Sequence, residues 1–529
     1  MTMIQNPILK GFCPDPSIVR AGEAYYIAVS TFEWWPGVKL FHSKDLQNWT
    51  QIGAALTRKS QLDMIGDPTS GGVWAPCLSY DNGRFYLVFT DVKTKKGRFY
   101  NTHNYLVWTD DIRGEWSEPV YLNSIGFDPS LFHDNDGKKY LINMVNGFKG
   151  VLVQEIDPQT WELIGERKKV YAGSGIGCTE GPHMYHIGEW YYLLTAEGGT
   201  GYDHCVTVAR SRSVWGPFET DPHNPLLTSE RGRDDALQKC GHGDLVQTQS
   251  GEWYLAHLCA RPKNGDDLCV LGRETAIQKL VLDADGWFRL KCGGRYAKNQ
   301  TESPEEIVPG NAEVVPALDR FVPEELTENG WNRWQNGYCS PRRPLGSDAS
   351  LTARNGYLRL IGRESLNSLH RVTLAAKRQT ALCMEACTRM EFYPEYEEQL
   401  AGLAYMYDAM NFYLFGKTVD AEGNPVLVLL KSDGGVITDE TEPIRLETDD
   451  AVTFRARTGQ DGAKVTFSYR QNGVWNTVKE DCTTEILTDE HCRGFTGAHF
   501  GMYVHDMTGL ALHADFEWFY LGEPQEDET

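Results

Sequence analysis

Short apolar runs separated by polar turns dominate the chain, and one arrangement of them recurs five times in the first 260 residues. Each copy is a glycine, two variable residues and a tyrosine that opens an apolar run; the glycines are Gly22, Gly83, Gly137, Gly188 and Gly251. An apolar run rich in β-branched and aromatic residues after a tight turn predicts a β-strand. The intervals of 61, 54, 51 and 63 residues are typical of propeller blades, so these copies predict a five-bladed β-propeller.

A polar turn followed by tryptophan recurs between the copies, in 42–53, 107–119, 155–165 and 209–220, and indicates the outer strands of the blades. The repeat fades after about Gly293. The polar segment 294–316, with its prolines and charges, predicts a linker with a boundary near 310–318. We therefore expect a propeller over 1–310 and a second domain over 318–529.

The second part of the chain alternates apolar and polar residues without a fixed period. Seven such segments are separated by turn signals: 357–363, 400–408, 411–417, 425–431, 453–459, 464–470 and 511–522. This spacing predicts a two-sheet sandwich of the concanavalin or jelly-roll kind, which makes the whole protein all-β.

Composition narrows the classes of partner. The 529 residues carry a formal net charge of −22, which repels nucleic acid. No stretch approaches 18 uninterrupted apolar residues, and the N-terminus lacks the pattern of a signal peptide, so we expect a cytoplasmic protein without a membrane partner. Thirteen scattered cysteines without a CxxC pair indicate buried thiols rather than a disulfide scaffold.

Seven to nine residues before the repeated glycines stand side chains that chemistry can use: Asp15, Trp74, Asp128, Glu180 and His242. Each Asp-Pro pair taken alone is equally consistent with a turn cap. A structural cap should recur in all five copies, and the carboxylate does not. Because equivalent strands of a propeller point at one axis, we expect the three carboxylates to meet at one mouth.

Facing carboxyl groups are what glycoside hydrolysis needs. A protonated one donates to the leaving oxygen, an ionised one activates water, and a third raises the pKa of the acid by like-charge repulsion. Phe32, Trp34, Trp35 and Trp74 offer rings for a sugar, although Trp34 and Trp35 fit inter-blade packing equally well. Arg273 lies in an apolar run, so we expect it to be half buried with a partner such as Asp15 or a sugar hydroxyl.

Seven motifs in order, FCPDPSIVR, TFEWWPGV, SGGVWAPCLSY, FDPSLFHD, TEGPHMY, CGHGDLVQT and LGRETAI, closely resemble the β-xylosidases of glycoside hydrolase family 43. The resemblance covers nearly the whole chain. It implies a propeller joined to a sandwich and an inverting enzyme that releases xylose from the non-reducing end of short β-1,4-xylo-oligosaccharides. No cofactor is required by this chemistry.

The resemblance also implies roles for residues. Asp15 is expected to be the general base, Glu180 the general acid, and Asp128 the group that raises the pKa of the acid and orients it. Arg273 would hold hydroxyls of the terminal sugar, and the apolar walls would be Phe32, Trp74 and Phe495, the last from a sandwich loop that closes the site. His242 is expected near the substrate, either as a satisfied core imidazole or beside a hydrated Ca²⁺ ion.

Alternatives stay open at this point. The three acids are shared by xylosidases and α-L-arabinofuranosidases, so the sugar is not decided. A silent carbohydrate-binding propeller should lack one of the acids, and a β-fructosidase should show WMNDPN-like and RDP motifs, which do not occur here. Because a sandwich that closes its own active site leaves other faces free, we expect a homo-oligomer, either a dimer or a tetramer.

Overall fold

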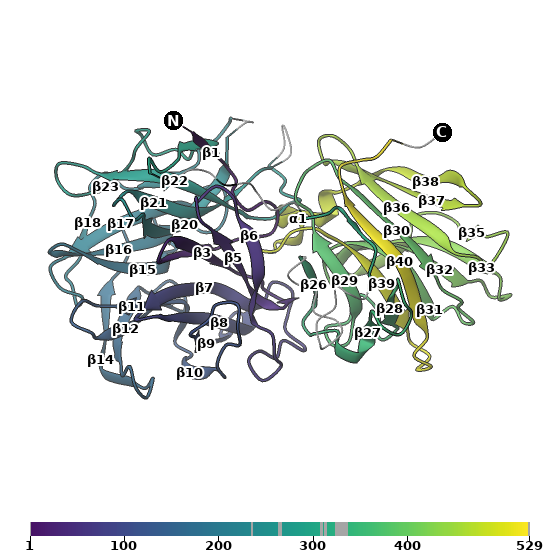
Figure 1. Cartoon of the computed structure of the whole chain (residues 1–529), viewed down its shortest axis with the longest axis horizontal. Coiled ribbons are helices and arrows are strands. Elements are labelled where there is room, and N and C mark those ends of the chain that lie inside the picture. The colour runs from purple at the N-terminus through teal and green to yellow at the C-terminus, as the bar shows by residue number, and fades with distance from the viewer. Residues whose placement is uncertain are drawn as a thin grey trace.

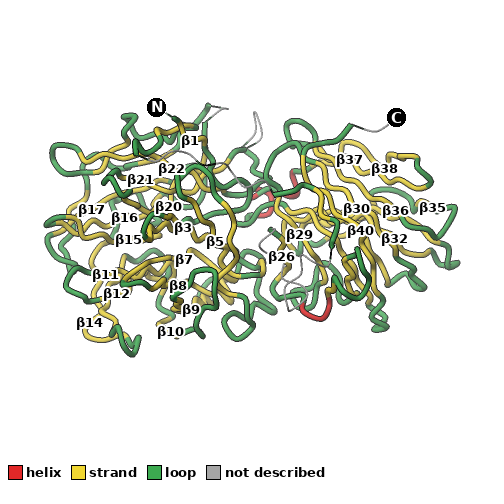
Figure 2. The backbone as a smooth tube through the Cα atoms, in the orientation of Figure 1, coloured by secondary structure: helices red, strands yellow, loops and turns green. Residues whose placement is uncertain are grey.

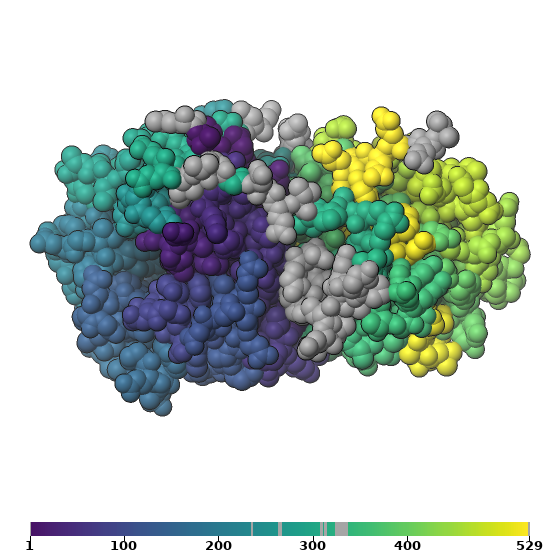
Figure 3. All heavy atoms as spheres, in the orientation of Figure 1, coloured from purple at the N-terminus to yellow at the C-terminus, as the bar shows by residue number. Residues whose placement is uncertain are grey.

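The computed structural model describes residues 2–233, 236–262, 267–306, 310, 315–322 and 337–526. Almost every described element is a β-strand, and two all-β lobes lie side by side (Figures 1 and 2). The space-filling view shows the N-terminal lobe, purple to teal, against the C-terminal lobe, green to yellow (Figure 3). No helix among the described residues is long and apolar enough to span a membrane.

The N-terminal lobe is a five-bladed β-propeller, as predicted. Each blade is one antiparallel sheet built from consecutive strands. The first blade contains β2 (Ser17–Ala21), β3 (Ala24–Val29), β5 (Gly37–Ser43) and β6 (Thr50–Leu56), and the second contains β7 (Gly72–Asp81), β8 (Arg84–Lys96), β9 (Phe99–Thr109) and β10 (Val120–Asn123). The third contains β11 (Gly126–His133), β12 (Lys139–Val145), β13 (Val151–Ile156) and β14 (Leu163–Tyr171).

The remaining blades follow the same order. The fourth contains β15 (Glu180–Ile187), β16 (Trp190–Glu197), β17 (Cys205–Ser211), β18 (Glu219–Thr220) and β19 (Leu227–Thr228). The fifth contains β20 (Gln238–Gln247), β21 (Trp253–Ala260), β22 (Glu274–Leu282) and β23 (Phe288–Leu290). Strand β1 (Met3–Gln5) pairs with β24 (Gln300–Glu302), which ties the start of the propeller sequence to its end.

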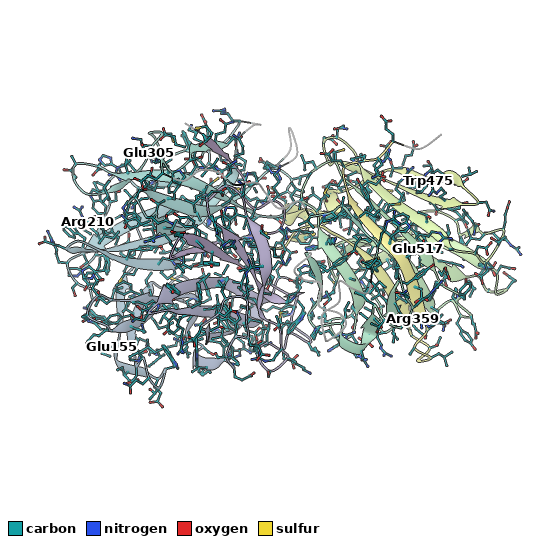
Figure 4. The ribbon with its side chains drawn as sticks, in the orientation of Figure 1. Glu155, Arg210, Glu305, Arg359, Trp475 and Glu517 are labelled. Carbon is teal, nitrogen blue, oxygen red and sulfur yellow. The ribbon has the colours of Figure 1, made fainter. Side chains whose placement is uncertain are left out.

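Apolar side chains fill every space between neighbouring blades. Val107 of the second blade packs with Leu40 of the first, and Leu131 of the third packs with Val88 of the second. Equivalent clusters join the third blade to the fourth, the fourth to the fifth and the fifth to the first. The ring is therefore closed by packing between blades, which leaves the inner strands to line the axis. Glu155 and Arg210, on the third strands of their blades, are labelled at the outer edge of the propeller in Figure 4.

The C-terminal lobe is a concanavalin-like sandwich of two sheets around its own apolar core, as predicted. One sheet contains β26 (Tyr338–Pro341), β29 (Thr373–Arg378), β31 (Gln399–Asp408), β32 (Asn411–Val419), β33 (Pro425–Asp433), β34 (Val436–Asp439), β35 (Ile444–Arg445) and β39 (His499–Asp506). The other contains β25 (Leu318–Asp319), β27 (Ala349–Ser350), β28 (Leu358–Ile361), β30 (Glu385–Glu391), β36 (Val452–Thr458), β37 (Lys464–Gln471), β38 (Val474–Thr483) and β40 (His513–Gly522).

The second of these sheets presents a charged and aromatic outer face, on which Arg359, Trp475 and Glu517 are labelled in Figure 4. The Arg359 guanidinium donates to Asp515 at 2.7 Å. The short helix α1 (Asp489–Cys492) lies where the lobes meet (Figure 1). The domain boundary predicted near 310–318 falls partly outside the described residues, at 311–314, and stays a prediction.

Strand pairing and apolar packing join the two lobes. Strand β4 (Trp34–Trp35) lies between β3 and β5 of the first blade in sequence, yet it pairs with β26 of the sandwich. Trp34 stacks on His499 with 4.0 Å between ring centroids, and Trp35 belongs to the apolar cluster between the first two blades. Both tryptophans therefore serve packing, which decides a question that the sequence left open.

Candidate active site

Four inner strands of the propeller, and the segment just before β2 in the first blade, depart from regular β-geometry at equivalent positions. The residues there have positive φ angles: Asp15 (52°), Ala75 (27°), Asp128 (50°), Gly181 (54°) and His242 (42°). The ladders of β7, β11, β15 and β20 shift register at these points, as β-bulges do. A bulge re-aims side chains and is enriched beside active sites.

In the second and fourth blades, the residue equivalent to Asp15 is one position later than the sequence repeat predicts. The positions equivalent to Asp15 are Ala75 and Gly181, whereas Trp74 and Glu180 stand one residue earlier. Glu180 therefore reaches the cavity from a backbone position different from that of the two aspartates. The glycine after it is required, because a Cβ on Gly181 would lie 2.9 Å from the His242 ring.

The bulged strands line one cavity of about 380 Å³. All eight residues predicted from the sequence line it: Asp15, Phe32, Trp74, Asp128, Glu180, His242, Arg273 and Phe495. Seven belong to the propeller and Phe495 comes from the sandwich. The Phe495 ring lies 5.9 Å from both Phe32 and Trp74, measured between centroids, so the three rings form one apolar wall.

Asp15 is a buried carboxylate held in its ionised form. Ser30 Oγ donates to its Oδ2 at 2.6 Å, and Arg273 Nη1 donates to its Oδ1 at 3.0 Å. Burial alone would raise the pKa of Asp15, but Arg273, His242 and Ser30 together lower it below its usual value. Ser30 is itself fixed, since its Oγ accepts from the Ala75 backbone N–H at 2.7 Å.

The pKa values of the other two carboxyls are shifted in the opposite direction. Burial and then the charge of Asp15 raise the pKa of Asp128 to about 7, although the Gly181 N–H donates to Asp128 Oδ2 at 3.0 Å. Burial, followed by repulsion from Asp128, raises the pKa of Glu180 well above its usual value. Glu180 Oε1 is buried and has no hydrogen-bond partner among the residues that the structure describes, so it is free to meet a ligand.

One cavity therefore contains an ionised carboxylate and a protonated carboxyl group. Carboxyl pairs whose environments push their pKa values apart are the signature of paired acid and base catalysis. Arg273 is 3% exposed and reaches Asp15, one of the two partners that its apolar run predicted.

His242 lines the cavity as a neutral imidazole, because burial lowers its pKa to about 4. The residues described around it do not fit a directly bound calcium ion, which takes six to eight oxygen ligands. The nearby Asp244 carboxylate already accepts from Ser17 Oγ at 2.7 Å and from the Ile18 N–H at 2.8 Å, and its other oxygen accepts from Tyr185. The hydrated ion expected beside His242 stays a prediction, and no step below passes through it.

Sequence reasoning missed several residues of the cavity: Ala75, Lys95, Tyr100, Phe127, Phe148, Gly199, Thr200 and Arg493. Lys95 is the most informative of them. Its Nζ lies 4.5 Å from the centre of the Phe495 ring and donates to the Ser70 carbonyl at 3.2 Å. Burial lowers the pKa of Lys95 to about 8. Phe127 precedes Asp128 directly and could have been found from that motif, whereas Lys95 lies in an extension of β8 without any signal of its own.

Comparison with known proteins agrees with this geometry. The model of glycosyl hydrolases family 43 matches residues 4–288, and that of the β-xylosidase C-terminal concanavalin A-like domain matches 331–521. The chain belongs to glycoside hydrolase family 43. The first match covers the propeller and all seven of its site residues, and the second covers Phe495.

Relatives of this family 43 chain align over its full length. A β-xylosidase of Bacillus subtilis (strain 168) is 44% identical, with 98% of this chain and 99% of the relative aligned. A xylosidase/arabinosidase 43B of Humicola insolens is 42% identical, with 98% and 97% aligned. The crystal structure of a xylan β-1,4-xylosidase from Bacillus halodurans C-125 superposes with a TM-score of 0.92 at 44% identity, covering 98% of this chain and 100% of that one.

Proposed function

We propose that this protein is an exo-acting, inverting glycosidase that releases D-xylose from the non-reducing end of β-1,4-xylo-oligosaccharides such as xylobiose. The observation that carries the proposal is one cavity lined by Asp15 and Glu180, whose surroundings shift their pKa values in opposite directions. The names of the two relatives and of the solved structure support xylose as the sugar.

In the proposed reaction Asp15 is the general base. Its carboxylate accepts a proton from a water molecule as that water attacks the anomeric carbon. Glu180 is the general acid, and its carboxyl proton passes to the glycosidic oxygen as the bond to the leaving sugar breaks. Attack from the face opposite the leaving group gives the inverted anomer, α-xylose from a β-xyloside.

Asp128 acts on the acid rather than on the substrate. Its charge raises the pKa of Glu180, and its hydrogen bond from the Gly181 N–H ties it to the strand that carries the acid. Arg273, Phe32 and Trp74 are proposed to bind the terminal sugar, the arginine through hydroxyl groups and the rings through the C–H face.

Proton NMR of the first turnover of xylobiose tests this mechanism. The expected first product from the non-reducing unit is α-xylose, which then mutarotates. Release of the non-reducing unit as β-xylose would contradict inversion. It would also contradict the assignment of Asp15 as a base instead of a nucleophile.

α-L-Arabinofuranosidase activity is the second candidate, as the main or a side activity. The Humicola insolens relative, described as a xylosidase/arabinosidase, favours it. Comparing kcat/KM for 4-nitrophenyl β-D-xylopyranoside and 4-nitrophenyl α-L-arabinofuranoside ranks the two. We expect the xyloside to be the better substrate, and a higher value for the arabinofuranoside would reverse the order.

The proposal includes a cytoplasmic location and a homo-oligomeric state. All thirteen cysteines are free thiols, most of them buried, and this supports a reducing compartment. Light scattering of the purified protein would measure its oligomeric state.

A further inference from the structure

The guanidinium of Arg273 is shared between the two domains. Its Nη1 donates to Asp15 of the propeller at 3.0 Å, and its Nη2 donates to the main-chain carbonyl of Phe495 in the sandwich at 3.3 Å. The sandwich therefore contributes more than an aromatic ring to the cavity. It also provides the second support of the arginine that lowers the pKa of Asp15.

A buried ion cluster lies behind the Phe495 segment. Lys239, on the bulged strand β20, is 4% exposed, and its Nζ lies 3.1 Å from Asp489 Oδ2 and 2.6 Å from Glu490 Oε1. Both acids belong to α1 of the sandwich. Lys239 and Asp489 are buried and the Glu490 side chain is 26% exposed. Burying an ion pair is costly unless the geometry repays it, so this cluster between two domains calls for an explanation.

Hydrogen bonds lead from this cluster to the residue beside Phe495. Asp489 Oδ1 accepts from the Tyr407 hydroxyl at 2.8 Å, and the same hydroxyl accepts from the Thr496 N–H at 3.2 Å. Glu490 Oε2 accepts from the Cys269 N–H at 2.8 Å, four residues before Arg273. The cluster thus supports both sides of the contact between Arg273 and Phe495.

The two segments also approach each other as closely as backbones allow. The Ala498 N–H donates to the Val270 carbonyl at 2.9 Å. A Cβ on Gly272, whose φ is +70°, would lie 2.1 Å from the Thr496 oxygen. The Phe495 segment is therefore packed directly against the backbone that carries Arg273, and we expect loss of the ion cluster to let it move away.

We propose that Lys239 is a positioning residue of the active site. Through its ion pairs with the two acids of α1, it keeps the Phe495 carbonyl on Arg273, and thereby keeps Arg273 on the proposed general base. This inference rests on the proposed function. The sandwich then helps to set the pKa of the base, in addition to placing the Phe495 ring in the wall of the cavity.

Several charged or titratable groups face Asp15 besides Arg273: His242, His204, Asp128 and Glu180. Both histidines are buried, with pKa values lowered to about 4 and about 3, so they are neutral at working pH. Asp128 and Glu180 are acids, so neither adds a positive charge that would lower the pKa of Asp15. Arg273 is thus the cation whose displacement would be felt most strongly by Asp15.

The test is Lys239→Met, measured by kcat and KM for 4-nitrophenyl β-D-xylopyranoside across pH. We expect kcat to fall by up to about a hundredfold, the loss that a small misplacement of a positioned group produces. We also expect the acid limb of kcat/KM to move to higher pH by up to about one unit, because Asp15 loses part of its guanidinium partner. A merely structural role would not move this limb.

Lys279→Met is the matched control. Lys279 lies on β22 of the same blade, is 8% exposed, and its ion pairs among the described residues are with Glu252 at 2.6 Å and Glu302 at 3.7 Å, both outside the sandwich. We expect a similar loss in melting temperature and the wild-type pH profile. If Lys239→Met retains the kcat and acid limb of the wild type, or if both variants change them equally, the inference is wrong.

Glu490→Gln keeps the size of the side chain and an acceptor for Cys269, and it replaces Lys239→Met should that variant not fold. The same shift in acid limb is expected, and its absence would overturn the inference. Each kcat and kcat/KM value is compared with that of the wild type, on whichever of 4-nitrophenyl β-D-xylopyranoside and 4-nitrophenyl α-L-arabinofuranoside the wild type hydrolyses better. A wild type inactive on both would refute the proposed function itself, and this result is distinct from an unshifted variant of an active enzyme.

Discussion

At the scale of single residues, the proton on Glu180 makes the clearest prediction. Glu180→Gln should reduce kcat/KM on xylobiose by about 10²- to 10⁴-fold, the usual contribution of a general acid. The loss should be much smaller for 2,4-dinitrophenyl β-xyloside, whose leaving group departs without a proton. Steady-state kinetics on the two substrates measure this difference.

Asp15→Asn is the comparison for that experiment, because a general base is needed whatever the leaving group. It should be defective on both substrates to a similar degree. Equal losses for Glu180→Gln on the two substrates would show that Glu180 is not the acid.

Asp128 makes a prediction about pH. Its charge raises the pKa of Glu180, so Asp128→Asn should lower that pKa. An acid catalyst works while protonated, so its activity is lost as pH rises through its pKa. The alkaline limb of kcat should therefore move to lower pH in Asp128→Asn, while the asparagine oxygen still accepts from the Gly181 N–H.

The control for this shift is Asp221→Asn, which removes a buried carboxylate bonded to Arg289 at the outside of a blade. Its pH–rate profile should match that of the wild type. An alkaline limb that stays in place in Asp128→Asn would mean that burial alone sets the pKa of Glu180.

At the scale of strands, the bulges decide where the acids point. Gly181→Ala should impair β15, because the new Cβ would lie 2.9 Å from the His242 ring and the φ of +54° strains any side chain. We expect a loss of about 1 kcal/mol in the free energy of unfolding and a clear fall in kcat/KM. Urea unfolding and kinetics measure the two effects.

Gly188→Ala separates strain from position. Gly188 lies in the turn between β15 and β16 and has a φ of +62°. No atom lies within 4 Å of the Cβ that alanine would add there. The Gly188→Ala variant should lose about as much stability as Gly181→Ala and keep wild-type activity. An active Gly181→Ala variant would show that the β15 bulge tolerates movement.

The strands were largely predictable from sequence, and the bulges were not. Alternation marks a strand such as β28 directly, since Leu358 and Leu360 are buried and Arg359 between them is only half-buried. A bulge adds one residue to one strand, so the repeat alone aligned Trp74 with Asp15, although Ala75 is the equivalent residue. The packing role of Trp34 was also unpredictable, because its strand pairs with β26, about 300 residues further on, and such a pairing leaves no local pattern.

At the scale of the whole molecule, the two domains share one apolar interface. Phe12, Phe32 and Trp34 of the N-terminal part pack with Leu374 and Tyr503 of the sandwich in a single buried cluster. Apolar packing on this scale resembles a domain core more than a transient contact. Neither domain presents this surface to water in the intact protein.

The separate propeller, residues 1–310, should therefore fail as an enzyme. Removal of the sandwich uncovers Phe12 and Trp34, leaves β4 without its partner strand, and takes the Phe495 carbonyl from Arg273. We expect a poorly soluble protein that binds a hydrophobic dye and has less than about a hundredth of wild-type kcat/KM, as loss of a positioning contact alone can cost that much. Co-refolding with residues 318–529 should restore activity, because the interface is built from side chains that both fragments retain. A soluble 1–310 fragment with full activity would mean that the propeller alone fixes Arg273 against Asp15, and that the contacts across the interface serve stability only.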